Sequence, residues 1–130
     1  MTRLTLPKIL VADALSCGAI FAIGVFATTP VAGLLGLPEL VVAAGGWICL
    51  AAGPLLAFLS ARPVRTLLAL AIVGNVAWVL ASVAVWIAWL EALTPAGHAF
   101  LLAQAAAVAI FTVLEMRGLR VGSSAQAAGA

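Results

Sequence analysis

Four long apolar stretches dominate the chain, and short segments that contain Pro, Gly or Arg separate them. A helix needs about 20 predominantly apolar residues to cross a bilayer. All four stretches are long enough, and the pattern predicts helices over about 8–29, 38–61, 65–90 and 96–116. The sequence therefore predicts an all-α membrane protein. Its single domain, 1–120, is a bundle of four transmembrane helices, and 121–130 is predicted to be a disordered tail.

The composition agrees with lipid as the main solvent. Of the 130 residues, 66% are hydrophobic and 8% are charged, and the mean hydropathy is +1.31. A soluble domain carries about 25% charged residues, so this chain could not cover a water-facing surface. The lipid bilayer is its first predicted partner. The net charge of +2 is small, and no nucleic-acid partner is predicted.

The basic residues indicate how the bundle would be oriented. All six fall into three clusters at the ends of apolar stretches: Arg3 and Lys8, Arg62 and Arg65, and Arg117 and Arg120. The two other turns carry no Lys or Arg. Because Lys and Arg are enriched in cytoplasmic loops, we expect a multi-pass protein of the bacterial inner (cytoplasmic) membrane with both termini in the cytoplasm.

Polar residues inside the apolar stretches are the candidates for chemistry, since such residues usually face the bundle interior. Helical spacing puts Asn75, Trp78 and Ser82 on one face, and Gln104 and Glu115 on one face of the last helix. A further carboxylate lies in the first helix. Counting about 1.5 Å per residue from the expected cytoplasmic helix ends places Trp78 and Gln104 at similar depth and Glu115 close to the cytoplasmic boundary. The residues of a possible ligand or proton site are Asp13, Asn75, Trp78, Gln104 and Glu115.

Each of these residues also has a simpler interpretation. Asn75 and Gln104 are the kind of side chain that joins helices by hydrogen bonds. Asp13 is either a functional intramembrane carboxylate or an interfacial one, paired with Lys8, Arg65 or Arg117 or reached by cytoplasmic water. Glu115, close to the expected helix end, also reads as an interfacial group. Pro54 predicts a kink, either tolerated or acting as a hinge.

The sequence does not predict an enzyme. It contains no Ser/His/Asp set, no phosphate loop and no cluster with metal-ligand spacing. Cys17 and Cys49 form no CxxC motif, and His98 is the single histidine. We therefore expect no catalytic residues, no metal and no cofactor.

Several short segments resemble small bacterial inner-membrane proteins of about this length, which are described only as uncharacterised four-helix proteins. The resemblance rests on 74–82 (GNVAWVLAS), 35–38 (LGLP), 51–54 (AAGP), Gln104-Ala105 and 118–120 (GLR). It implies the fold and the compartment and no activity. Small multidrug-resistance transporters also have four short helices with an acidic residue in the first, but their basic bias is often weak, whereas here it is complete.

Two functions remain open. The first is a non-enzymatic membrane protein that acts through helix packing, as a homo-oligomer or as an accessory subunit of a larger complex. The second is a small proton-coupled transporter or a protein that binds a lipophilic ligand through the polar intramembrane residues. A dry, filled centre with Asn75 and Gln104 bonded to their neighbours favours the first, and an open polar pocket that contains Trp78 favours the second.

Overall fold

The computed structural model describes the backbone of residues 5–129 and the side chains of residues 5–121, and this part of the chain forms five α-helices. They are α1 (Leu6–Phe26), α2 (Thr28–Leu35), α3 (Glu39–Ala61), α4 (Arg65–Ala88) and α5 (Pro95–Gly129). Four of them are long and apolar enough to cross a membrane: α1, α3, α4 and the Pro95–Val121 part of α5. The predicted all-α architecture with four helices of spanning length is confirmed.

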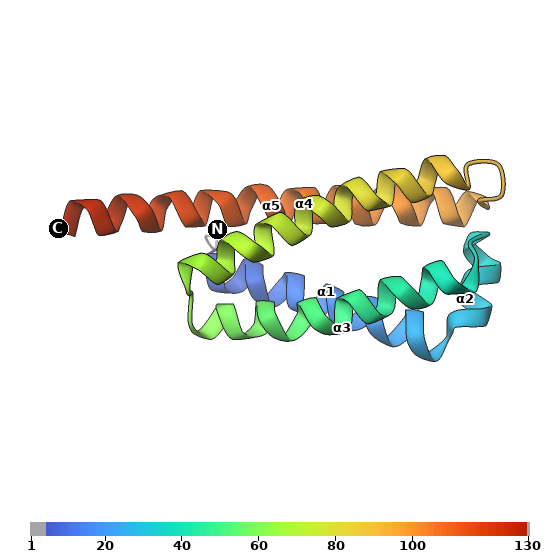
Figure 1. The fold of residues 1–130 in the computed structure, drawn as a ribbon, viewed down its shortest axis with the longest axis horizontal. Helices are drawn as coiled ribbons and strands as arrows, with labels where there is room; N and C mark the ends of the chain where they lie inside the picture. Colours follow the sequence, from blue (N-terminus) through green and yellow to red (C-terminus); the bar gives the residue numbers. More distant parts are fainter. Residues whose placement is uncertain (1–4, 130) are drawn as a thin grey trace.

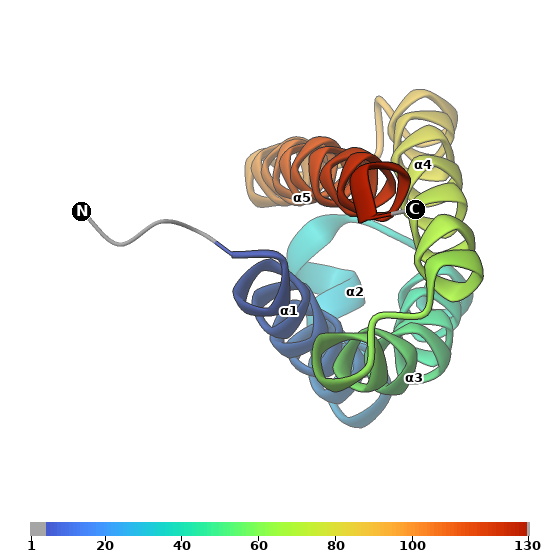
Figure 2. The same cartoon turned by 90° about the vertical axis from the view of Figure 1, so that its left-hand side faces the viewer.

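The helices form two antiparallel pairs. α1 packs mainly on α3 and α4 mainly on α5, with fewer contacts between the pairs (Figures 1 and 2). The start of α1, the α3–α4 connection and the C-terminal part of α5 lie at one end of the bundle (Figure 1). We call this the basic end, because Lys8, Arg62, Arg65, Arg117 and Arg120 belong to these segments and all are exposed. Arg3 lies outside the described residues.

The predicted boundary between the first two helices is wrong. The first helix was expected to reach residue 29 and a turn to follow, but α1 ends at Phe26 and 28–35 forms the separate helix α2. Pro30 sits in the first turn of α2, where proline is tolerated. The hydroxyl of Thr28 donates to the carbonyls of Gly24 (2.6 Å) and Val25 (3.1 Å), which occupies the carbonyl groups left open at the end of α1.

The last helix is longer than the sequence predicted. We expected an end near Met116, because Gly118 is a common C-terminal residue, yet α5 continues to Gly129. Gly118 instead allows α5 to approach α1, since a Cβ at this position would lie 2.8 Å from a methyl group of Leu6. The expected disordered tail therefore has a helical backbone over 121–129, and Ala130 lies outside the described residues.

Glycines set the closest contacts inside the bundle. A Cβ at Gly24 would lie 2.9 Å from the Val42 carbonyl oxygen, and one at Gly46 would lie 3.3 Å from the backbone of Gly24. The backbones of α1 and α3 thus meet where neither has a side chain, as is common between transmembrane helices.

The buried apolar core has two parts. One lies toward the basic end and consists of Leu10, Leu56, Leu59, Leu68, Ala71 and Ile72. The other joins α2, the α4–α5 connection and α5, and consists of Leu35, Leu37, Leu93 and Leu101. The polar residues of the candidate site lie on the helices that carry these two parts.

Candidate functional site

The structure brings three of the five candidate residues into direct contact. Asn75 of α4 donates one hydrogen bond to Asp13 Oδ2 of α1 (3.1 Å) and another to Glu115 Oε2 of α5 (2.9 Å). Its amide group thus bridges two carboxyl groups from two other helices. Asp13 is 2% exposed and Glu115 is 0% exposed. We call these three residues the carboxyl cluster.

Both carboxyl groups are buried inside the bundle, and their position near the membrane interface stays a prediction. Glu115 does not lie at a helix end, because α5 continues well beyond it, and its side chain turns inward to Asn75. Asp13 is bonded to the same amide rather than open to water. Among the basic residues offered as partners, Lys8 and Arg117 are exposed.

One atom of the carboxyl cluster is buried without a hydrogen bond. Glu115 Oε1 has no partner among the residues that the structure describes. A buried polar atom of this kind is costly, on the order of 1–3 kcal/mol and more when it is charged. Most buried polar atoms in proteins have a partner, so this oxygen is an exception that needs an explanation.

The other two candidate residues form a second cluster. The Trp78 indole donates to Gln104 Oε1 (2.6 Å), and Gln104 Nε2 donates to the Ser82 hydroxyl (2.8 Å) and to the Leu101 carbonyl (3.2 Å). Ser82 in turn donates to the Trp78 carbonyl (2.8 Å). These groups satisfy one another and tie α4 to α5. We call Trp78, Ser82 and Gln104 the indole cluster.

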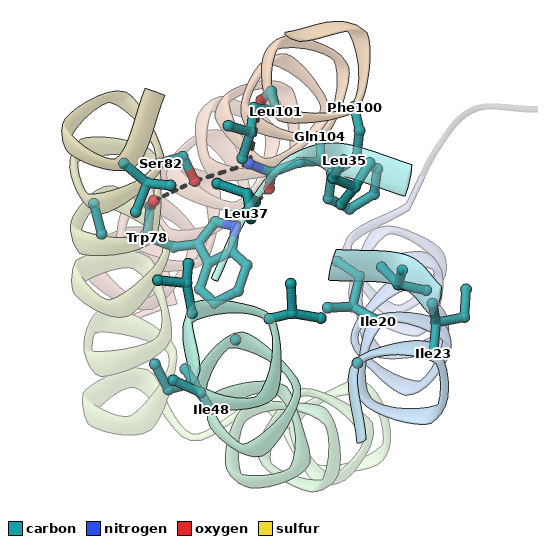
Figure 3. A pocket seen from close by; sticks show the side chains of 18 of the residues that line it. Ile20, Ile23, Leu35, Leu37, Ile48, Trp78, Ser82, Phe100, Leu101 and Gln104 are labelled. Carbon is teal, nitrogen blue, oxygen red and sulfur yellow. Dashed lines mark hydrogen bonds between the residues drawn. The ribbon is translucent and has the colours of Figure 1, made fainter. Parts of the chain in front are cut away.

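An apolar cavity lies beside the indole cluster, between the two helix pairs and toward the α2 end (Figure 3). Its volume is about 530 Å³ and all five helices contribute to its wall. Trp78 and the polar groups of Ser82 and Gln104 stand on one side, and aliphatic side chains such as Ile20 and Ile48 stand on the others (Figure 3). It is partly open to the surroundings.

The cavity is the feature that sequence reasoning missed. No hydrophobic periodicity in the sequence predicts the cavity, because short stretches of every helix form its wall. One of these helices, α2, was expected to be a turn. The useful signal was Trp78 next to Gln104 at matching depth, since a large ring beside an amide is unlike simple aliphatic filling.

The remaining polar side chains belong to neither cluster. The Trp86 indole donates to His98 Nδ1 (2.9 Å) near the start of α5. Cys17 and Cys49 are free thiols. Among the described residues, no group of three or more His, Cys, Asp or Glu is arranged to hold a metal ion.

Comparisons with known proteins identified no relative of this chain. No family model, no curated protein and no solved structure matches the chain. The resemblance to small four-helix inner-membrane proteins stays a prediction, and function has to be argued from the two clusters and the cavity.

Proposed function

We propose that this chain is a non-enzymatic, multi-pass protein of the bacterial inner membrane that binds a lipophilic molecule in the cavity between its helix pairs. Four helices of spanning length and the exposed apolar surface support the membrane part. The cavity beside Trp78 carries the binding part. Both termini face the cytoplasm in this proposal, because the described basic residues gather at one end of the bundle (Figure 1).

The size and lining of the cavity favour an apolar occupant. Sites for small molecules typically measure about 300–1,000 Å³ and are lined mainly by apolar and aromatic side chains, and this one has about 530 Å³. Because the cavity is apolar and partly open to the surroundings, an apolar chain from the bilayer or a dedicated ligand can enter and fill it.

The indole cluster favours an apolar ligand, because its polar groups need no hydrogen-bond partner from the ligand. Its donors and acceptors are already paired with one another. A strongly polar ligand would have to break these bonds, whereas a hydrocarbon chain packs against the face of Trp78. The expected ligand is therefore a lipid-derived chain of the acyl or isoprenoid type.

Filling the cavity with a side chain is expected to displace this ligand. A Cβ at Gly45 would point at the Trp78 ring from 3.6 Å, an ordinary contact, so Gly45→Leu places its remaining carbons in the cavity. Native mass spectrometry of the protein, purified in detergent, should show a retained lipophilic molecule in the wild type. We expect about tenfold less retention in Gly45→Leu, equivalent to about 1.4 kcal/mol.

Gly74→Leu is the matched control for this experiment. Gly74 is also a helical glycine, but a Cβ there would meet nothing within 4 Å and the residue does not line the cavity. Retention in this variant should equal that of the wild type. A wild type that retains no lipophilic molecule, or equal retention in both variants, contradicts the proposal.

The same spectra test the second candidate function, an oligomer or accessory subunit that acts through helix packing. A surface groove of small residues between α1 and α3 favours it, with Ala14, Gly18, Gly53 and Ala57 in its wall. Small residues let transmembrane helices approach closely. A dimer or larger species without a bound lipophilic molecule would support packing alone, and a monomer that carries the molecule would contradict it.

The proposed orientation predicts which connections an impermeant thiol reagent reaches. In a Cys17→Ser/Cys49→Ala background, Glu91→Cys should react in intact cells and Val64→Cys only after lysis. Both positions are exposed in the structure, so a difference in reactivity reports the side of the membrane. Labelling of Val64→Cys in intact cells would overturn the cytoplasmic placement of the basic end.

A further inference from the structure

The carboxyl cluster places two acidic side chains in the low-dielectric interior of the bundle. Ionising both of them there would be energetically very unfavourable. Asp13 and Glu115 are both buried, and both receive a hydrogen bond from the same Asn75 amide. Two carboxylates that share a site cannot both ionise easily, and a buried charge is costly unless it is paired and hydrogen-bonded. The amide supplies one N–H to each acid and no positive charge that would offset two negative ones.

The unpartnered oxygen shows where a further hydrogen fits. Glu115 Oε1 is the one polar side-chain atom buried without a partner among the described residues. An O–H between the two carboxyl groups would satisfy this oxygen and would remove one of the two negative charges. The step needs only a proton from water, which forms an O–H bond on a carboxylate lone pair.

A metal ion fits this cluster less well than a proton. Divalent calcium takes 6–8 oxygen ligands, whereas the amide presents N–H groups to both acids. The part of the chain that the structure describes contains no group of three or more His, Cys, Asp or Glu arranged to hold a metal ion, and two carboxyl groups supply too few ligands.

The described hydrogen-bond partner of both acids is the uncharged Asn75 and not a basic residue. The titratable neighbours of the cluster are Cys17 on α1 and Cys49 on α3, which are neutral when they carry their own protons. Asn75, the α4 residue of the cluster, is uncharged. The basic residues Lys8, Arg65, Arg117 and Arg120 have exposed side chains at the basic end.

We propose that Asp13 and Glu115 form a proton-binding site that holds one proton between them at neutral pH, with Asn75 as the fixed donor to both. The site joins α1 of one helix pair to α4 and α5 of the other. The bound proton therefore holds the two pairs together by removing like-charge repulsion across their interface. This proposal is independent of the cavity and stands or falls separately from it.

Infrared spectroscopy of the full chain can detect this proton directly. A protonated carboxyl group gives a C=O band that shifts on exchange into D2O, and a maltoside detergent contributes no carbonyl of its own. The chain has four acidic side chains, and the two outside the cluster, Glu39 and Glu91, are exposed. At pH 7 we expect a band with the intensity of one carboxyl group.

Two variants assign the band. Glu39→Gln/Glu91→Gln leaves Asp13 and Glu115 as the acidic side chains and should keep the band at full intensity. Asp13→Asn/Glu115→Gln should abolish it. If the latter variant does not fold, the former decides, because its spectrum contains no other acidic side chain. No band in the wild type, a band with the intensity of two carboxyl groups, or a band that persists in Asp13→Asn/Glu115→Gln would overturn the proposal.

Discussion

Replacing Asn75 by leucine is expected to cause the largest loss of stability of any single polar substitution in this protein. The variant removes both hydrogen bonds that reach the buried carboxyl groups and supplies no donor in their place. Losing two hydrogen bonds, at least one of them to a charged group, and leaving the buried acids without a donor costs about 3–5 kcal/mol. The free energy of unfolding, measured by titration with a denaturing detergent, should fall by about this amount.

Neutralising the two acids should remove most of that cost. In the Asp13→Asn/Glu115→Gln background the cluster holds no charge, and the two new amides can donate to each other. We expect Asn75→Leu to cost about 1 kcal/mol there, the value of an ordinary hydrogen bond. An equal loss in both backgrounds would mean that Asn75 matters for its shape and not for the carboxyl groups.

The four helices of spanning length were predictable because apolar length is a local property of the sequence. The predicted 38–61 and 65–90 agree with Glu39–Ala61 and Arg65–Ala88 to within two residues. Arg62 and Pro63 mark that connection without ambiguity. The ends of the first and last helices were predicted wrongly, at Thr28-Thr29-Pro30 and at Gly118, because proline and glycine each have two structural roles. Proline ends one helix and also begins another, and glycine ends a helix or lets a neighbour approach.

The faces of the candidate site were predictable, whereas its division into two clusters was not. Helical spacing placed Asn75 and Trp78 on one side of α4, and counting residues placed Trp78 and Gln104 at matching depth, in agreement with their hydrogen bond. The same counting set Glu115 near the membrane boundary. The long side chain and the continuation of α5 beyond it bring its carboxyl group to Asn75 instead. Depth along a helix does not determine where a flexible side chain ends.

The cavity could not be predicted because it depends on the helix that sequence reasoning took for a turn. Leu34 and Leu35 of α2 line it together with Phe100 and Leu101 of α5. Their positions depend on how α2 is fastened to the start of α5. Thr94 makes this connection: its hydroxyl donates to the Leu34 carbonyl (2.5 Å) and its backbone amide to the Leu35 carbonyl (3.1 Å).

Gly97→Ala is accordingly expected to destabilise the α2 end of the bundle and to disturb the cavity with it. A Cβ at Gly97 would overlap the Leu35 carbonyl oxygen and would lie 2.9 Å from a methyl group of Leu93. The start of α5 must then move away from α2. Overpacking typically costs about 1–3 kcal/mol, and each Thr94 hydrogen bond lost adds about 1 kcal/mol. The midpoint of thermal unfolding should fall clearly, and retention of the lipophilic molecule should fall with it.

Gly33→Ala separates this effect from the general consequences of replacing a glycine. Gly33 lies in α2 itself, and a Cβ there would meet nothing within 4 Å. Alanine is favoured over glycine inside a helix by about 1 kcal/mol, so this variant should be at least as stable as the wild type and should retain the molecule equally well. If Gly97→Ala and Gly33→Ala have the same midpoint of thermal unfolding, the position of α5 does not depend on its close approach to Leu35. If Gly97→Ala has a lower midpoint of thermal unfolding but still retains the molecule, the contact stabilises the bundle without shaping the cavity.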